Sequence, residues 1–145
     1  MRRRPTVFDF DACIQGMTNQ RLGIVQRQKL IYFAYRTYVI GTGKAPFQNR
    51  AEAWPLGPVF PDLQHNPSRK GDATALNELM QNVCRRTVEC LGHLSGARLI
   101  KASHAYCTEW QKARLFVKAG KIGGERITPQ LIRKALNQPA IVFFR

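Results

Sequence analysis

Two motifs decide the fold of this chain: Gln28-Lys29-Leu30-Ile31-Tyr32-Phe33-Ala34-Tyr35 and Glu52-Ala53-Trp54-Pro55-Leu56-Gly57-Pro58-Val59-Phe60-Pro61-Asp62-Leu63. The first motif has the apolar spacing of an amphipathic helix, which we predict over 24–40, ending at Gly41-Thr42-Gly43. The second motif is too rich in proline for a long helix and too apolar for a solvated linker. We therefore expect residues 45–71 to form an irregular segment that folds onto the helix.

Further helices are predicted on both sides of these motifs. Acidic residues near its start favour a short helix over 9–19. A long helix is predicted over 73–90, with shorter ones over 95–102, over 109–119 and after Thr128-Pro129. The buried stripe of the long helix is expected to contain Leu76, Leu79, Met80, Val83, Thr87, Cys90, Leu91 and Leu94.

These elements predict a mainly α fold. We expect a compact single-domain bundle of five to seven helices, with an irregular Pro-rich segment and at most short strands. Residues 1–8 are interpreted as a basic N-terminal arm and residues 9–145 as one helical domain.

The composition narrows the class of protein. Hydrophobic residues make up 44% of the 145 residues, which excludes disorder as the main description. The apolar run Ala140–Phe144 is far shorter than the roughly 20 residues that span a bilayer, so no membrane partner is expected. No secretory leader is recognised, so we expect a cytoplasmic protein with reduced cysteines.

The net charge of +14 favours an acidic protein or nucleic acid as partner.

Basic residues are the candidates for contact with such partners. They lie in several short clusters, and no helix-turn-helix, zinc-finger or RNA-recognition signature accompanies them. Each could bind phosphate or an acidic surface, or could simply be solvated. The candidates are Arg2, Arg3, Arg4, Arg69, Lys70, Arg85 and Arg86, with Arg114, Lys118 and Lys121 as a further group.

Motifs for catalysis and metal binding are weak. The run 41–44 lacks the features of a phosphate-binding loop, because Tyr38 stands where a glycine is required and Ala45 where a hydroxyl is required. The pairs Cys90-x-x-His93 and His104-x-x-Cys107 could together hold zinc, but their spacing matches no standard finger. We therefore expect no enzymatic activity, no cofactor and no metal, and keep the zinc site as an alternative.

The two opening motifs resemble the Panacea antitoxin domain, a SocA-like, phage-associated family. Its pattern is a QKLLYFA helix, a GKPLF turn (here Gly43-Lys44-Ala45-Pro46-Phe47) and an EAW-x-x-GPV-x-P-x-L segment. Three later stretches also resemble the family, at its YG-x-LS, TH and W-x-x-AR patterns: Leu91–Ser95, Ser103-His104 and Trp110–Arg114. The resemblance covers about residues 10–138.

The resemblance implies a helical, non-enzymatic, protein-binding module from a mobile element or prophage. Such a module neutralises a toxin, or another host or defence protein, by direct contact, and one branch of the family delivers its toxin to a protease as an adaptor. The matched residues would shape the domain or contact the partner: Trp54, Gly57, Pro58, His104, Trp110 and Arg114. The chain departs from the pattern at Pro55-Leu56, Ser103 and Glu109, and in its charge. The alternative is a basic nucleic-acid-binding accessory or regulatory protein on the same fold.

Overall fold

The computed structural model describes residues 3–115 and 125–135, and the structural statements below concern these residues. The helices there are α1 (Val7–Gly16), α2 (Ile24–Thr42), α3 (Pro61–His65), α4 (Glu78–Leu91), α5 (Gly96–Tyr106), α6 (Thr108–Arg114) and α7 (Pro129–Lys134). The strands are β1 (Ala51–Trp54), β2 (Gly57–Val59) and β3 (Arg126–Ile127). The predicted mainly α fold with at most short strands is confirmed.

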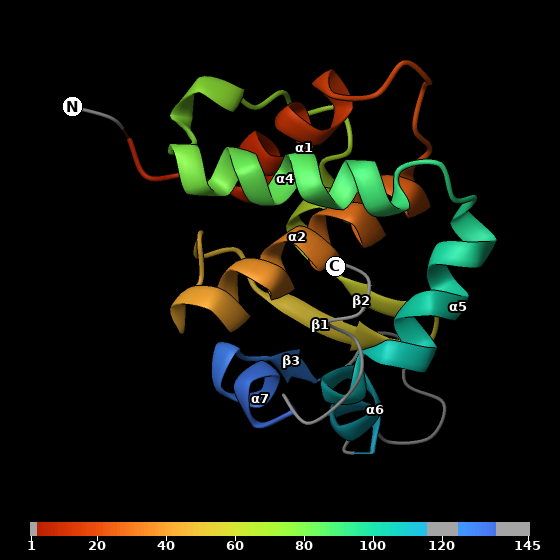
Figure 1. Ribbon diagram of the computed structural model, residues 1–145. Helices are drawn as coiled ribbons and strands as arrows, with labels where there is room; N and C mark the ends of the chain where they lie inside the picture. The colour runs from red at the N-terminus through yellow and green to blue at the C-terminus, as the bar shows by residue number, and fades with distance from the viewer. Residues whose placement is uncertain (1–2, 116–124, 136–145) are drawn as a thin grey trace.

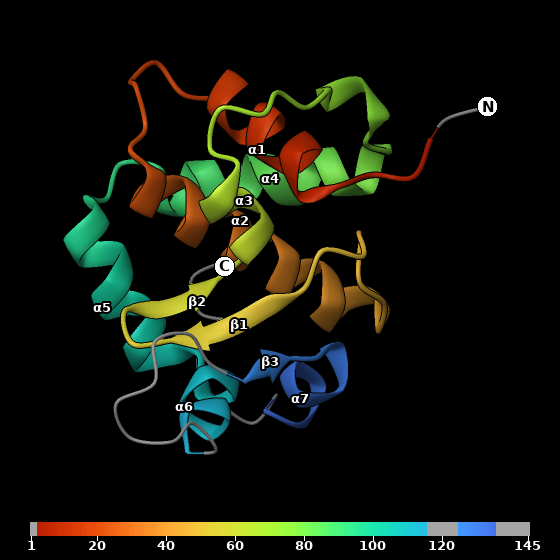
Figure 2. The ribbon, with the colours of Figure 1, turned by 180° about the vertical axis from the view of Figure 1, so that it is seen from behind.

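Helix α2 runs through the middle of the molecule (Figure 1). Helices α1 and α4 pack on one side of it, while the small sheet, α6 and α7 lie on the other (Figures 1 and 2). Every residue from Gln28 to Arg36 is buried. A helix covered on several sides buries its polar side chains too, so these must find partners inside the protein.

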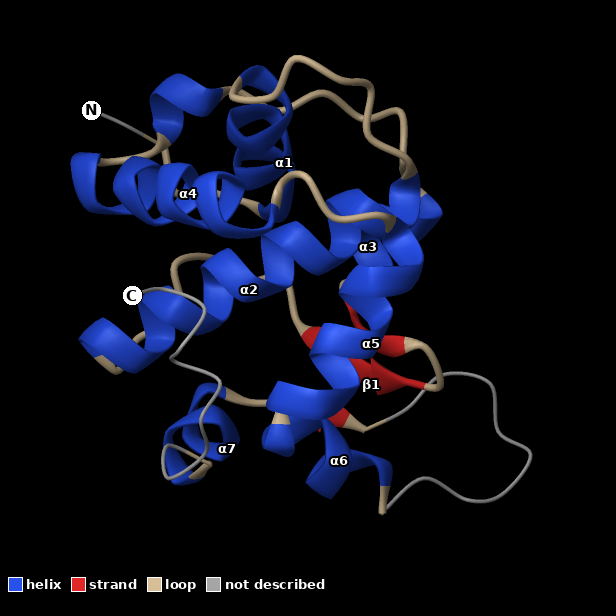
Figure 3. Ribbon diagram, turned by 45° about the vertical axis from the view of Figure 1, so that its right-hand side comes forward, coloured by secondary structure: helices blue, strands red, loops and turns tan. Residues whose placement is uncertain are grey.

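The sheet is small and antiparallel (red in Figure 3), and its strand order is β2-β1-β3 (Figure 2). Strands β1 and β2 form a hairpin in which Trp54 pairs with Gly57. On the other edge Ala51 pairs with Ile127. The irregular Pro-rich segment thus contains this hairpin and α3, while β3 has no counterpart among the predicted elements.

Aromatic packing joins the helical motif of residues 28–35 to the Pro-rich motif of residues 52–63. The ring centroids of Tyr35 and Phe60 lie 5.4 Å apart, and Phe47 lies 5.2 Å from Tyr35 and 5.3 Å from Phe60. Helix α2 ends at the expected glycine: Gly43 has a φ of 77° and its N–H donates to the Val39 carbonyl.

Within the described part of the chain, no helix is long and apolar enough to cross a membrane.

The start of helix α4, predicted at residue 73, differs from the prediction. The Asp72 side chain accepts a hydrogen bond from the Thr74 N–H and closes a short 3-10 turn over Ala73–Ala75. Helix α4 begins only at Glu78, where the Asn77 side chain caps it by accepting from the Met80 N–H. Two capping residues in succession therefore replace the single helix start predicted at 73.

Three further predictions about helices need correction. Leu79 is 49% exposed, because the buried stripe of α4 runs through Met80, Val83, Cys84, Thr87 and Leu91 and leaves Leu79 outside it. Helix α1 covers Val7–Gly16 instead of 9–19, because the Thr6 N–H donates to the Asp9 carboxylate and fixes an earlier start. Helix α5 continues to Tyr106, beyond the predicted end at 102. The end predicted for α6, at residue 119, lies outside the described residues.

Candidate functional site

The β1–β2 hairpin is pressed closely against α5 and α2. Its turn ends at Gly57, whose φ of 111° is a conformation that residues with a side chain rarely adopt. A Cβ atom there would lie 2.5 Å from Ser103 Oγ and 3.0 Å from Lys29 Cε. Glycine therefore allows both the turn and the close approach of the hairpin. The carbonyl of the next residue, Pro58, accepts a hydrogen bond of 2.9 Å from Lys29 Nζ.

Helix α6 holds the other side of the hairpin. The Trp110 indole N–H donates to the Trp54 carbonyl at 2.7 Å, and Arg114 Nη1 donates to the Ala53 carbonyl at 3.1 Å. The His104 ring stacks on Trp110 with centroids 4.1 Å apart. Burial, followed by the nearby Lys29 ammonium, lowers the pKa of His104. The structure thus brings together the residues that the sequence proposed as site-shaping, and Trp110 and Arg114 among them hold backbone carbonyls of the hairpin in place.

Two buried polar residues of α2 fix the hairpin from beneath, and sequence reasoning did not single them out. The Gln28 amide donates to the Phe60 carbonyl at 3.0 Å and accepts from the Phe60 N–H at 2.9 Å. Lys29 is almost fully buried, and burial lowers its pKa to about 8. A lysine and a glutamine inside an apolar helical run indicate buried polar side chains, and such side chains need hydrogen-bond partners. This pattern could have identified both residues from the sequence.

A buried ionic cluster joins α2 to α6. Glu109 Oε2 accepts from the Tyr32 hydroxyl at 2.6 Å and from Arg36 Nε at 2.7 Å. All three residues are at most 1% exposed. In the sequence, Glu109 is distinctive only as a departure from the family pattern. The cluster explains the departure, since the carboxylate neutralises an arginine that α2 carries into the core.

An apolar groove opens beside the hairpin, between α2 and α5. It measures about 400 Å³ and is lined by Val25, Gln28, Lys29, Trp54, Pro55, Leu56, Val59, Gln64 and Ile100. We call it the hairpin groove. Leu56, in the hairpin turn, is 60% exposed, and Val25 is 38% exposed. Exposed apolar side chains around a hollow are typical of surfaces that bind another protein.

The structure brings only some of the basic candidates together. Arg3, Arg4, Arg69 and Lys70 line one small hollow, which we call the basic hollow. Within it, Arg3 makes two hydrogen bonds of 2.6 Å to Asp9, and the Arg69 guanidinium lies 4.6 Å from the Phe8 ring centre. The other candidates do not line this hollow: Arg85 and Arg86 are exposed on α4, while Arg2, Lys118 and Lys121 lie outside the described residues.

The structure does not assemble the alternative zinc set. Cys107 is fully buried and Cys90 is half-buried, whereas His93 is exposed. In the described ranges, no three side chains of His, Cys, Asp or Glu are grouped as they would have to be to hold a metal ion.

The comparisons with known proteins point to one family. No match is found among curated proteins or among solved structures. A family model does match, over residues 28–111, and its description is antitoxin SocA-like, Panacea domain. This range covers more than half of the chain and runs from the buried face of α2, through the hairpin and its groove, to Trp110 on α6. The chain therefore belongs to the SocA-like antitoxin family that the Panacea domain defines.

Proposed function

We propose that the protein is an antitoxin-like binding module that neutralises a toxin, or another host or defence protein, by direct contact at the hairpin groove. The observation that carries this proposal is the apolar groove with its exposed Leu56, which lies almost wholly within the matched part of the chain. A binding surface needs an apolar centre that its partner can cover, and the groove supplies one.

The surrounding side chains favour binding over catalysis. The polar groups next to the groove hold the scaffold: Lys29 donates to Pro58, Gln28 pairs with Phe60, and Trp110 holds the hairpin from the other side. A rigid hairpin loses little conformational freedom when a partner covers it, which favours affinity. We propose stoichiometric binding as the mode of action, and delivery of the bound partner to a protease as a further role.

The charge indicates the kind of partner. A net charge of +14 would steer an acidic protein toward the groove and raise its association rate. Because that attraction is screened by salt, contact in the groove should outlast the long-range steering at high ionic strength.

A capture experiment tests the proposal. The tagged protein is incubated with nuclease-treated lysate of its native host and washed at about 0.5 M salt, where the Debye length is only about 4 Å. The variant Leu56→Asp places a charge in the groove, and Leu79→Asp, an equally drastic change at an exposed leucine of α4, serves as control. We expect one protein near stoichiometry with the wild type and the control, and its loss with Leu56→Asp. The proposal is wrong if no protein is retained, or if Leu56→Asp retains it equally well.

A second candidate function is nucleic-acid binding at the basic hollow. The observation that favours it is the meeting of Arg4, Arg69 and Lys70 from separate parts of the chain. Anisotropy of a labelled duplex, followed over a range of salt, tests it. The double variant Arg69→Gln with Lys70→Gln should reduce the slope of log K against log salt by about 2, whatever the sequence of the duplex. Binding that ignores salt would exclude this function.

A further inference from the structure

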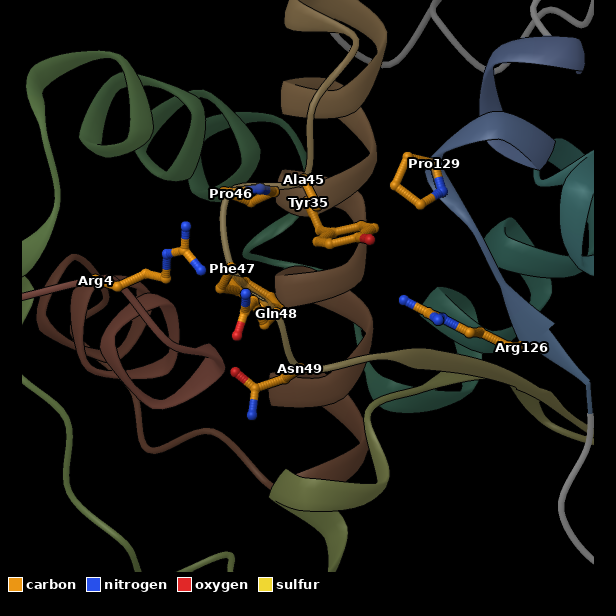
Figure 4. A pocket seen from close by; sticks show the side chains of 9 residues that line it. All are labelled: Arg4, Tyr35, Ala45, Pro46, Phe47, Gln48, Asn49, Arg126 and Pro129. Atoms are coloured by element: carbon orange, nitrogen blue, oxygen red, sulfur yellow. The ribbon is translucent and has the colours of Figure 1, made fainter.

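A further hollow of about 500 Å³, which shares Arg4 with the basic hollow, lies beside the C-terminal half of α2 (Figure 4). The loop after α2 forms one wall, and β3 with the start of α7 forms another. Its lining includes Arg4, Tyr35, Phe47 and Arg126. We call it the Tyr35 hollow. It contains two arginines and no carboxylate, so its charge is not balanced from within.

Tyr35 is a buried side chain with an unused donor. Only 3% of the residue is exposed, and its ring packs against Phe47 and Phe60. Its hydroxyl makes no hydrogen bond to any described residue, and it points away from Phe47, toward the side from which Arg126 reaches in (Figure 4). Burial raises the pKa of Tyr35 to about 12, so the hydroxyl keeps its proton and can donate at neutral pH. Among the described residues the Tyr35 oxygen is not one of the fully buried polar atoms that lack a partner, so it is open to the hollow and can donate to a ligand there.

Arg126 faces the same space. It is exposed on β3 and extends toward the Tyr35 hydroxyl (Figure 4), close enough for its charge to lower the pKa of Tyr35 slightly against the effect of burial. Arg4 enters from the N-terminal segment at the opposite end. Neither guanidinium forms an ion pair with a described residue. Within the described part of the chain, two cations without an ion pair and one hydroxyl without a hydrogen bond therefore line one hollow from three separate segments, with Arg126 on the side of the hydroxyl and Arg4 at the opposite end.

We propose that the Tyr35 hollow binds a phosphate monoester. The phosphoryl oxygens would accept hydrogen bonds from the Tyr35 hydroxyl and the Arg126 guanidinium, and Arg4 would supply the second positive charge. A phosphate monoester is close to a dianion at neutral pH and offers three oxygens in different directions, which suits donors on different segments. A carboxylate offers one charge and two oxygens in one plane, and it satisfies this arrangement less well. The same phosphoryl chemistry is found on a nucleotide and on a phosphorylated side chain of a protein.

Titration calorimetry at low ionic strength tests the proposal with inorganic phosphate, AMP, O-phosphoserine and acetate as probes. The informative variants are Arg126→Gln and Tyr35→Phe, of which the second removes only the hydroxyl and keeps the packed ring. Arg98→Gln is the matched control, because it removes the same charge from an exposed position on α5. Thermal melts of each variant show that it is folded.

We expect saturable binding of phosphate at one site and weaker binding of acetate. Because hydrogen bonds to charged groups are strong, Arg126→Gln should weaken phosphate binding by at least about tenfold and Tyr35→Phe by about threefold to tenfold, while Arg98→Gln changes it less than about twofold. Tighter binding of AMP than of O-phosphoserine would identify a nucleotide as the source of the phosphate, and the reverse would identify a phosphorylated protein. No saturable binding of phosphate, equal binding of acetate, or an equal loss in Arg98→Gln would overturn the proposal.

Discussion

The substitution Gly57→Ala tests the account of the hairpin most sharply. The new Cβ would meet Ser103 Oγ at 2.5 Å and Lys29 Cε at 3.0 Å, and the φ of 111° is strained for alanine in any surroundings. Backbone strain at such a φ and overpacking of a tight site each cost about 1–3 kcal/mol. Part of this cost is relieved by movement of the flexible Lys29 stem, so we expect the free energy of unfolding to fall by about 3 kcal/mol.

Urea denaturation measures this loss, and Gly41→Ala provides the control. Gly41 lies inside α2, has nothing within 4 Å of its Cβ position and has an ordinary φ. Alanine there should stabilise the protein by up to about 1 kcal/mol. Adding Ser103→Ala to Gly57→Ala should recover part of the loss, because it removes the nearer clashing atom. A Gly57→Ala variant whose free energy of unfolding lies within about 0.5 kcal/mol of the wild-type value, a change typical of surface sites, would show that the hairpin does not require glycine at this position.

Three further predictions concern buried charge. Glu109→Gln leaves the Arg36 cation without its carboxylate and should lower the free energy of unfolding by about 3 kcal/mol in urea. The pKa of Lys29 is lowered to about 8 in the folded protein, so the unfolded chain binds more protons between pH 8 and 10.5. Stability relative to Lys29→Met should therefore rise over that range, by about 3 kcal/mol, and a flat difference would contradict the assigned pKa. Hydrogen bonds from Arg3 and from the backbone outweigh burial and lower the pKa of Asp9, so acid titration of unfolding should show a loss of stability below about pH 4 that Asp9→Asn lacks.

Local sequence patterns predicted the elements whose conformation depends on residues nearby in the chain. Helix α2 and its glycine stop follow from apolar spacing and from Gly43, both of which are visible within a few turns of chain. Strand β3 does not follow from any local pattern, because two residues become a strand only by pairing with Ala51 and its neighbour, about 75 positions earlier. The exposure of Leu79 depends likewise on which side of α4 its neighbours cover.

The candidate site likewise contains residues that the sequence identified and residues that it did not. The family motif marked Trp54, Gly57 and Trp110, which the structure places around one hairpin. Lys29 and Glu109 were missed, because the acceptor or donor that makes their burial tolerable comes from a distant element. Polar residues in a buried helix show that partners must exist, but the sequence alone does not identify them.

Binding of a protein partner in the hairpin groove can be tested by amide hydrogen exchange, measured with and without the protein captured from the lysate, because exchange reports local protection of the backbone. The account predicts slower exchange in the hairpin turn, at Leu56 and Gly57, and no change in α4 around Leu79. Protection confined to the basic hollow, with unchanged exchange in the hairpin, would contradict it.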